Sequence, residues 1–401
     1  MAFSFSFSGD DIEEDTQQTP PPAPPPPPAD SGAANPTASP PTAFSTTTAG
    51  AFPVQGKPLL PPLLHDLDHL LARLPSKIAF GLLNVDLEVD PDPSHGDGGN
   101  QRQLALPRRE LWDVRVQLMA EDDDPSPSSA AAGEPSESSE ARAGLGQHDV
   151  KTGIYEGGFK SWESSVDLVK VLARERTIEG LLSRGPSVVV ELGCGTALPS
   201  LALFAWALDH GTTPKHPLSL VLADYNPSVL YLVTLPNLIL AWALQQRATT
   251  PLVAEAFTPD GELELTPELL AAFRSSLAEH RIALAFLSGA WSPEFVDLLY
   301  SALPADLPGT AATLVLGSET IYSPFALESF SATLFAMLQR ERRERPEGGA
   351  RAVVAAKRLY FGVGGSLDDF VDRMRALGAA VRTLAEETQG VHRGVVDCAL
   401  P

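Results

Sequence analysis

The stretch that most constrains the fold is Ser187–Pro199, which reads Ser-Val-Val-Val-Glu-Leu-Gly-Cys-Gly-Thr-Ala-Leu-Pro. Its run of three valines is typical of a strand that is covered on both faces, as in a parallel sheet. Gly193 and Gly195 permit positive φ angles and a close approach of the backbone to a ligand. Apolar residues continue from Leu198 onward. This pattern predicts a buried strand, a glycine loop and a mostly buried helix.

The residues that this loop lacks exclude two classes of ligand. A dinucleotide fingerprint would have a third glycine where Leu198 stands, and the Gly-Lys-Ser/Thr ending of a P-loop is absent. Glu191 at the strand end, followed by Gly-x-Gly, resembles the first motif of the seven-stranded S-adenosylmethionine-dependent methyltransferases, although their further glycine is Ala197 here. A purely structural strand, turn and helix stays open at this point, since short motifs also occur by chance.

From Val150 onward, short Val/Leu/Ala runs alternate with amphipathic stretches, which is typical of βαβ units. Strands are expected at Ser187–Leu192, Leu218–Ala223, Ile282–Leu287, Ala312–Gly317, Ala350–Ala356, Ala380–Leu384 and Gly394–Leu400. Helices are expected at Ser164–Arg174, Leu198–His210, from Ser228 with a break or kink at Pro236, and at Pro267–Glu279, Pro293–Ser301, Phe325–Arg342 and Leu367–Leu377. We therefore predict an α/β fold that resembles a class I (Rossmann-like) methyltransferase: a seven-stranded, mostly parallel sheet with helices on both faces and a closing antiparallel hairpin. Ligands of such sheets bind outside the carboxyl ends of the strands.

The N-terminal part has a different composition. Residues 1–58 are acidic and contain most of the 15 prolines found between Pro20 and Pro62, which predicts a disordered arm. Residues 59–120 are expected to form a small structured extension packed on the main domain, with a helix over Leu63–Leu74 and strands at Lys77–Val89 and Leu111–Leu118. Residues 121–149 are acidic and rich in serine and alanine, as in a linker, and residues 150–401 form the predicted methyltransferase domain.

Charge and composition limit the classes of partner. The chain of 401 residues carries a net charge of −22, and its first 150 residues hold 23 acidic against 8 basic side chains. No large basic patch is available to contact phosphates, so direct nucleic-acid binding is not expected. An acidic arm suits a basic protein partner, and plain solvation is the alternative explanation.

Two cysteines, Cys194 and Cys398, provide no disulfide framework, and no metal-ligand spacing of histidine or cysteine occurs, so no metal site is predicted. The N-terminus lacks a basic segment followed by an apolar run. The longest apolar stretch, Val229–Leu244, is interrupted by polar residues and by Pro236. Neither a signal peptide nor a membrane span is expected.

Two of the predicted strands end in residues suited to bind adenosine. Asp224 follows the second strand about 30 residues after the glycine loop, where nucleotide-binding proteins hold ribose hydroxyls with a carboxylate. Helix capping is the alternative role for Asp224. The third strand is followed by Gly289 and Trp291, whose indole would either stack on adenine or belong to the core.

The fourth predicted strand leads to Ser318, Glu319 and Tyr322, which would face the reactive end of the cleft or, alternatively, form a turn with a solvated glutamate and a packed tyrosine. Two segments combine glycines with aromatic residues. The segment Ile154–Glu163 is expected to fold back over the cofactor. The segment Leu359–Gly365 suits a loop that faces the substrate, with a plain turn as the alternative.

Several segments occurring in order resemble the eukaryotic, fungal-type protein-histidine N-methyltransferases. These segments are Tyr155–Glu163, Asp224–Asn226, Thr234–Asn237, Ser318–Tyr322 and Tyr360–Gly365. The resemblance covers about Lys151 to the C-terminus, and the opening Met1–Ser8 is similar as well. This chain departs from the family at Ala197 and in the long insertion Thr249–Arg281.

The resemblance implies S-adenosyl-L-methionine as cofactor and a histidine ring nitrogen of a large-subunit ribosomal protein as acceptor. It also implies Glu319 and Tyr322 as catalytic residues. Together with the missing targeting signals it implies a cytoplasmic and nuclear location, and we separately expect the chain to act as a monomer. Together with the loop and strand ends above, the predicted cofactor site comprises Lys160, Ser161, Trp162, Glu163, Ser164, Glu191, Gly193, Gly195, Asp224, Tyr225, Asn226, Gly289, Trp291 and Ser318. The predicted substrate-binding residues are Tyr360, Phe361 and Gly362.

Such an enzyme accelerates the reaction mainly by positioning its two reactants, because methyl transfer from a sulfonium needs a nucleophile in line with the bond that breaks. A histidine with a pKa of about 6.5 is largely neutral at pH 7, whereas a lysine at about 10.4 must first lose a proton. We hypothesise that Glu319 accepts a hydrogen bond from the other ring N–H and that Tyr322 shapes the pocket. The alternatives are a lysine methyltransferase of the same fold acting on a translation factor or chaperone, a small-molecule methyltransferase, and a non-enzymatic scaffold that binds a basic ribosomal protein.

Overall fold

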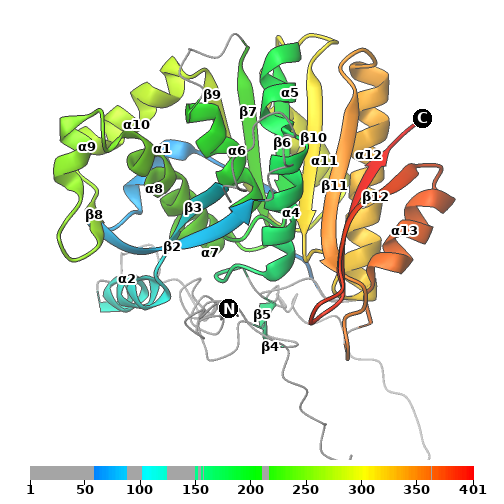
Figure 1. Cartoon of the computed structure of the whole chain (residues 1–401), viewed down its shortest axis with the longest axis horizontal. Coiled ribbons are helices and arrows are strands. Elements are labelled where there is room, and N and C mark those ends of the chain that lie inside the picture. The colour runs from blue at the N-terminus through cyan, green and yellow to red at the C-terminus, as the bar shows by residue number, and fades with distance from the viewer. Residues whose placement is uncertain are drawn as a thin grey trace, which may run out of the picture.

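The computed structural model describes residues 58–87, 102–123, 150–151, 155–156, 158–209, 216–362 and 364–401 (Figure 1). The predicted arm, apart from its last residue, lies outside the described residues. So does the predicted linker, apart from residues 121–123 at the end of a helix. Gly157 and Val363 of the two glycine and aromatic segments are also outside them.

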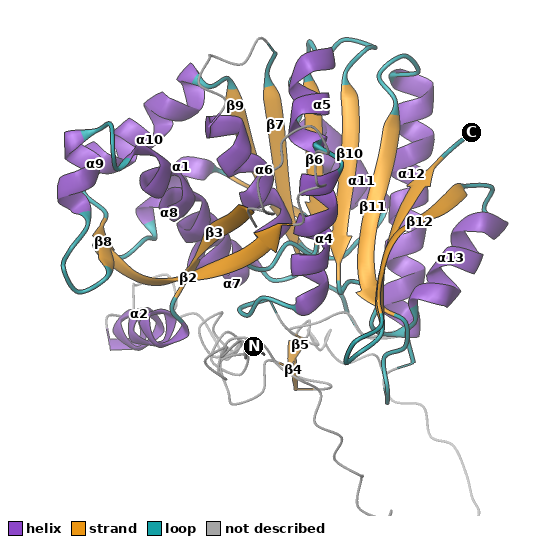
Figure 2. Cartoon of the chain, viewed as in Figure 1, coloured by secondary structure: helices purple, strands orange, loops and turns teal. Residues whose placement is uncertain are grey.

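The main sheet contains eight strands in the order β1-β9-β7-β6-β10-β11-β13-β12 (Figure 2). Their bounds are β1 (Leu63–His65), β6 (Ser187–Leu192), β7 (Leu218–Asp224), β9 (Ile282–Ser288), β10 (Ala312–Ser318), β11 (Ala350–Lys357), β12 (Ala380–Glu387) and β13 (Arg393–Ala399). The five strands from β9 to β11 are parallel, and β13 is antiparallel to both of its neighbours. The predicted class I fold with its closing hairpin is confirmed, with β1 as an eighth, antiparallel edge strand.

Both faces of this sheet are covered, which explains the continuous apolar strands. In β6, Val189 packs in one buried cluster, and Val188 and Val190 pack in the other, as the two-residue period of a strand requires. The first cluster includes side chains of α4 (Glu163–Arg174), α5 (Thr177–Arg184), α6 (Leu198–Asp209), α8 (Leu235–Gln246) and α10 (Pro267–Glu279). The second includes α11 (Pro293–Ser301), α12 (Pro324–Glu344) and α13 (Leu367–Ala376).

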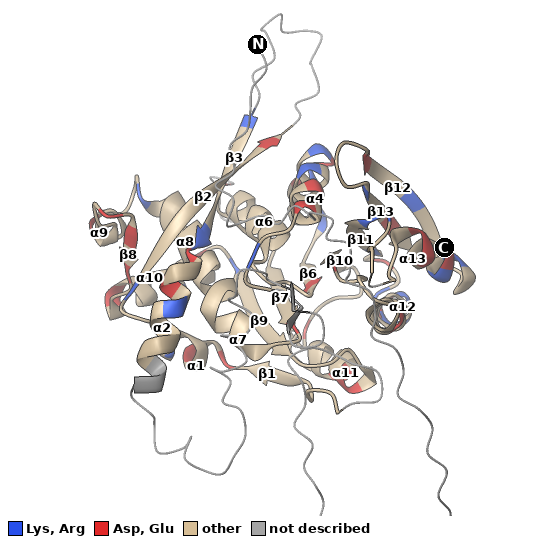
Figure 3. Ribbon diagram, turned by 90° about the horizontal axis from the view of Figure 1, so that it is seen from below, with Lys and Arg blue, Asp and Glu red and all other residues tan. Residues whose placement is uncertain are grey.

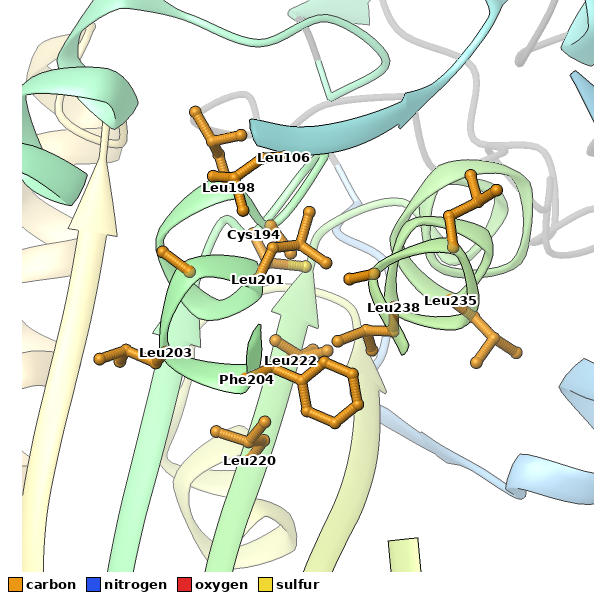
Figure 4. Packing of buried hydrophobic residues seen from close by; sticks show 14 of the residues in the cluster. Leu106, Cys194, Leu198, Leu201, Leu203, Phe204, Leu220, Leu222, Leu235 and Leu238 are labelled. Atoms are coloured by element: carbon orange, nitrogen blue, oxygen red, sulfur yellow. The ribbon is translucent and has the colours of Figure 1, made fainter. Parts of the chain in front are cut away.

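The glycine loop rests on buried side chains of the first cluster. Leu201 and Phe204 of α6 lie close to Leu222 of β7 and Leu238 of α8 (Figure 4). All four side chains are fully buried. The loop that enters α6 is therefore supported from below by tightly packed side chains, which fix its position relative to the strand ends.

The helix that follows β7 is continuous from Pro227 to Gln246 but changes its winding. It consists of α7 (Pro227–Val229), a π-helical turn η1 (Leu230–Thr234) and α8. Pro236 has no N–H to donate within the helix, and the carbonyl of Leu232 accepts a hydrogen bond from Arg109 Nη1 at 2.9 Å. In place of a kink at Pro236, the helix has the π-helical turn η1 just before this proline.

This helix is also long and apolar enough to cross a membrane by length and composition. The fold covers 89% of its apolar window, so the burial of a core helix accounts for that composition.

The predicted helix over Leu63–Leu74 is partly wrong. Its first residues form β1, which pairs with the free edge of β9, and α1 is confined to Leu67–Ala72. Asp66 sets the start of α1, because its side chain accepts a hydrogen bond from the His69 N–H at 3.0 Å. Two prolines directly before Leu63 also favour an extended chain there.

The predicted strand over Leu111–Leu118 is wrong, because this segment belongs to helix α2 (Leu111–Asp123). Val114 and Leu118, both fully buried, are spaced four residues apart and lie on one face of that helix. The strand just before it, β3 (Arg102–Arg109), was not predicted.

A second, three-stranded sheet joins the extension to the insertion. The antiparallel partners β2 (Lys77–Leu87) and β3 form a hairpin that projects from the main sheet (Figure 3). The strand β8 (Glu262–Glu264) of the insertion pairs with β2. The remaining elements are β4 (Val150–Lys151), β5 (Tyr155–Glu156) and α9 (Pro251–Ala256).

Candidate active site

The glycine loop between β6 and α6 is held against Asp224. The N–H of Gly195 donates to Asp224 Oδ2 at 3.0 Å, and Gly195 has a φ of 51°. A Cβ on Gly195 would lie 3.2 Å from the carbonyl oxygen of Gly158, so the glycine also permits a close approach of a second chain segment. Ala197, where the resembling family has a glycine, keeps a left-handed φ of 58°. The loop therefore retains this geometry at the cost of about 1–2 kcal/mol of steric strain at Ala197.

Two carboxyl groups lie beneath and beside this loop. Glu191 is fully buried and accepts a hydrogen bond from the Ser200 N–H at 3.0 Å. Its burial raises the pKa of the carboxyl to about 8, so Glu191 holds a proton at neutral pH. Asp224 also accepts from the Asn226 N–H at 3.1 Å, and burial raises its pKa to about 6. Asp224 is therefore largely ionised at pH 7.

A cleft of about 970 Å³, counted with the open space at its mouth, lies at the carboxyl ends of β6, β7, β9 and β10. The predicted residues that line it are Lys160, Trp162, Gly193, Gly195, Asp224, Tyr225, Asn226, Gly289, Trp291, Ser318, Glu319 and Tyr322. The structure thus brings most of the predicted site together around one cavity.

Several predicted site residues do not line the cleft. Ser161 shares a hydrogen bond with the Thr196 hydroxyl at 3.0 Å. Glu163 forms an ion pair with Arg393 at 2.9 Å, and Glu191 faces the start of α6. Ser164 and Tyr360 both donate to Glu319. Ser161, Ser164 and Tyr360 thus hold residues that line the cleft.

The loop after β11 was predicted to face the substrate, and its residues differ in exposure. Tyr360 is buried, with its hydroxyl 2.5 Å from Glu319 Oε2. Phe361 is 78% exposed, and Gly362 follows it in the turn with a positive φ of 79°. Of these three residues, the exposed phenyl ring is therefore the one placed to touch a protein bound outside the cleft.

Glu319 is the most constrained side chain at the end of β10. Its φ of 57° is in the left-handed region, which costs energy for a residue with a Cβ. Ser164 Oγ donates to Oε1 of its carboxylate and Tyr360 to Oε2. Burial raises the pKa of the Glu319 carboxyl, and the charge of Lys357 and these two donors oppose that rise.

Lys357, at the end of β11, is a buried cation that the sequence did not single out. Its ammonium group lies 5.5 Å from the ring centroid of Trp162 and 5.8 Å from that of Tyr360. Burial, followed by the charge of Glu319, raises the pKa of Tyr360 well above its ordinary value. Tyr360 therefore remains a hydrogen-bond donor to Glu319 throughout the neutral range.

Sequence reasoning also missed several residues of the lining. These are Leu59, Gly158, Ser165, Cys194, Thr196, Leu198, Ala290, Thr320, Phe325, Ala326 and Ser329. Cys194, Thr196 and Leu198 lie within the glycine loop, so their position beside Gly193 and Gly195 could have identified them as lining residues. Leu59 lies far from every motif in the sequence and gave none. Trp291 lines the cleft and also contacts the core residue Phe330 edge to face at 5.4 Å, so its stacking on adenine stays a prediction.

In the described part of the chain, no group of three or more His, Cys, Asp or Glu side chains is placed to hold a metal ion. The two cysteines are free thiols and buried.

The chain was compared with known proteins and structures. No family model matches it. Histidine protein methyltransferase 1 of Saccharomyces cerevisiae is 38% identical over 277 residues, which cover 66% of this chain and 67% of the yeast protein. The protein of the same name from Schizosaccharomyces pombe is 34% identical over 334 residues, 82% of this chain and 83% of that protein. The chain belongs to the histidine protein methyltransferase 1 family.

This protein is therefore an enzyme, a protein-histidine N-methyltransferase, and its cofactor is S-adenosyl-L-methionine, as the glycine loop and Asp224 predicted. Among solved structures, an rRNA methyltransferase from Streptomyces viridochromogenes covers 61% of this chain and 88% of its own, at 15% identity and a TM-score of 0.34. That likeness is slight, and the fold class rests on the strand order.

Proposed function

We propose that this enzyme methylates a histidine ring nitrogen in a large-subunit ribosomal protein. Family membership supports the histidine acceptor, and the resemblance of the motifs supports the ribosomal substrate. The net charge of −22 suits a basic protein partner, because opposite charges accelerate encounter and disfavour acidic competitors. We also propose that the enzyme acts as a monomer in the cytoplasm and nucleus.

The residues of the cleft fit S-adenosyl-L-methionine. Asp224 is a buried carboxylate that can accept hydrogen bonds from two ribose hydroxyls, and Gly195 lets the backbone come close to the ligand. In the proposed arrangement Trp291 faces the adenine, and Ser318 and Glu319 stand at the reactive end. When bound, this cofactor supplies a methyl group that is already activated on a sulfonium.

The observation that supports a histidine acceptor best is the Glu319 cluster. Each carboxylate oxygen has one protein donor, and a carboxylate offers about four lone-pair sites, so capacity remains for an imidazole N–H. A bond from Glu319 to one ring nitrogen fixes the tautomer and leaves the lone pair of the other nitrogen free to attack. The same carboxylate stabilises the positive charge that the ring gains during transfer.

The function is tested by incubating the enzyme with labelled S-adenosylmethionine and ribosomal proteins from cells that lack it. The labelled band is then hydrolysed and its amino acids are separated. We expect methylhistidine in one large-subunit protein. Methyllysine, or methylhistidine only in proteins outside the large subunit, would contradict the proposal.

A further inference from the structure

The chain just before β1 crosses the cleft end formed by β7 and β9. The N–H of Leu60 donates to the hydroxyl of Tyr225 at 3.1 Å, and the Leu60 carbonyl accepts from the Ala290 N–H at 2.9 Å. Tyr225 follows β7 and Ala290 follows β9, and both line the cleft. The preceding residue, Leu59, lines the cleft as well. Leu60 therefore joins the segment of residues 58–62 to both strand ends.

This segment also lies flat against the loop after β9. A Cβ on Gly289 would be 2.4 Å from the Pro61 carbonyl oxygen and 2.7 Å from Pro62 Cα, so only glycine allows this contact without a shift. Immediately downstream, β1 pairs with β9 in antiparallel register. His65 Nε2 and Ser288 Oγ lie 2.8 Å apart there. The segment is thus anchored at Leu60 and on the C-terminal side of Leu60.

The strand order shows which part of the cleft the segment closes. In the sheet, β9 and β7 lie on one side of β6 and β10 lies on the other. Glu319 follows β10, so the segment lies at the end of the cleft remote from the reactive carboxylate. In the proposed function, Asp224 at the end of β7 holds the ribose, which places the adenine next to Leu59.

We propose that residues 58–62 are part of the cofactor site, with the side chain of Leu59 packing on the adenine of S-adenosylmethionine. The inference rests on the proposed function, because it takes the ribose position from Asp224. It follows that binding of the cofactor and ordering of the segment are coupled. By linkage, the factor by which the ordered segment strengthens cofactor binding equals the factor by which the bound cofactor favours the ordered segment.

The first test compares two leucine truncations in the full chain by calorimetric titration with S-adenosylhomocysteine. Leu59 is 37% exposed and lines the cleft, whereas Leu64 is 38% exposed on β1 and does not. Leu59→Ala should weaken binding about three- to tenfold, because it removes apolar area from the ligand contact. Leu64→Ala, the matched control, should leave the dissociation constant unchanged. Equal constants for both variants and the wild type would overturn the inference.

The second test measures the segment itself. Deuterium uptake of the peptide spanning residues 58–65 should slow when S-adenosylhomocysteine is added to the wild type. Gly289→Ala should reduce that protection, since its Cβ displaces Pro61. Uptake unaffected by a ligand that demonstrably binds would reject the coupling while leaving the proposed function intact. Absence of any binding to the wild type would remove the cofactor assignment and the inference together.

Discussion

The two ends of the cleft hold their carboxylates in different ways. Asp224 accepts hydrogen bonds from the backbone N–H groups of Gly195 and Asn226. Glu319 accepts from the side chains of Ser164 and Tyr360. Backbone donors are fixed by the path of the chain, whereas hydroxyl donors can be deleted one at a time. The proposed adenosine end is thus set by the backbone, and the proposed reactive end is set by a few side chains.

The largest effect is expected from Glu319→Gln, which removes the charge at the reactive end and keeps the shape. We expect kcat to fall by about 10²–10⁴, because a neutral amide stabilises the developing imidazolium poorly. The dissociation constant of S-adenosylhomocysteine should stay within about twofold of the wild type, since Glu319 belongs to the other end of the cleft. Methyl transfer and calorimetry measure the two quantities.

Glu255→Gln on the exposed side of α9 is the matched control for this charge change and should be silent. Full turnover of Glu319→Gln with normal cofactor binding would show that the carboxylate has no part in the reaction.

At the adenosine end, Asp224→Asn should act mainly on the dissociation constant of the cofactor, in contrast to Glu319→Gln, which should act mainly on kcat. An asparagine can accept through only one atom, so its amide NH₂ would oppose either the Gly195 or the Asn226 N–H. We expect the S-adenosylhomocysteine dissociation constant to rise about 100-fold, from the combined loss of the ribose contact and of loop geometry. Calorimetry measures it, and circular dichroism checks that the fold persists. Unchanged affinity would place the ribose elsewhere.

The pH dependence of cofactor binding gives a second test of the difference between Asp224 and Glu319. The pKa of Asp224 is raised to about 6 by burial, so the carboxyl takes up a proton as the pH falls through 6, loses its charge and keeps only part of its capacity to accept from the ribose. We expect S-adenosylhomocysteine to bind about tenfold more weakly at pH 5 than at pH 7. Titrations from pH 5 to 8 measure this, and Asp224→Asn should give a flat profile. A wild-type profile that is also flat would contradict the assignment of Asp224 as the carboxylate that binds the ribose.

Tyr360→Phe removes one of the two donors to Glu319. Kcat should fall about tenfold, the value of one charge-assisted hydrogen bond of about 1.4 kcal/mol or more. Because the Tyr360 hydroxyl favours the ionised carboxylate, its loss raises the pKa of Glu319 further. The acidic limb of the pH–rate profile should therefore move to higher pH. A lower kcat without this movement would indicate a packing effect only.

The smallest effect is expected at the exposed ring beside it. Phe361→Ala should raise KM for the protein substrate about two- to fivefold and leave the cofactor constant and the melting temperature unchanged, because the side chain is 78% exposed. Steady-state kinetics with the protein substrate measure it. An unchanged KM would remove Phe361 from the substrate surface.

The same contrast explains which parts of the site could be predicted. The Gly195 N–H donates to the Asp224 side chain, 29 residues away, and each residue follows the end of a predicted strand, so spacing was enough to find them. The donors to Glu319 come from 155 and 41 residues away, and no spacing rule links them. Leu59 reaches the cleft only because β1 pairs with β9, a register that needs the whole sheet.

The main sheet was predictable because its strands are buried on both faces and read as apolar runs. The extension was harder for the opposite reason. On α2, Trp112 and Val116 are more than half exposed, which masked the helical spacing of the buried Val114 and Leu118 and suggested a strand.

Arg109 has a consequence for the order in which the molecule is made. Its N–H donates to the Asn237 side chain, whose amide in turn donates to the Thr196 carbonyl in the cofactor loop. Arg109 and Asn237 are 128 residues apart, a stretch that takes on the order of 10 s to synthesise. The hairpin that carries Arg109 thus leaves the ribosome long before α8, the helix that carries its partner Asn237. This hairpin therefore waits for its partner helix during synthesis, so we expect it to be a part that chaperones meet during translation.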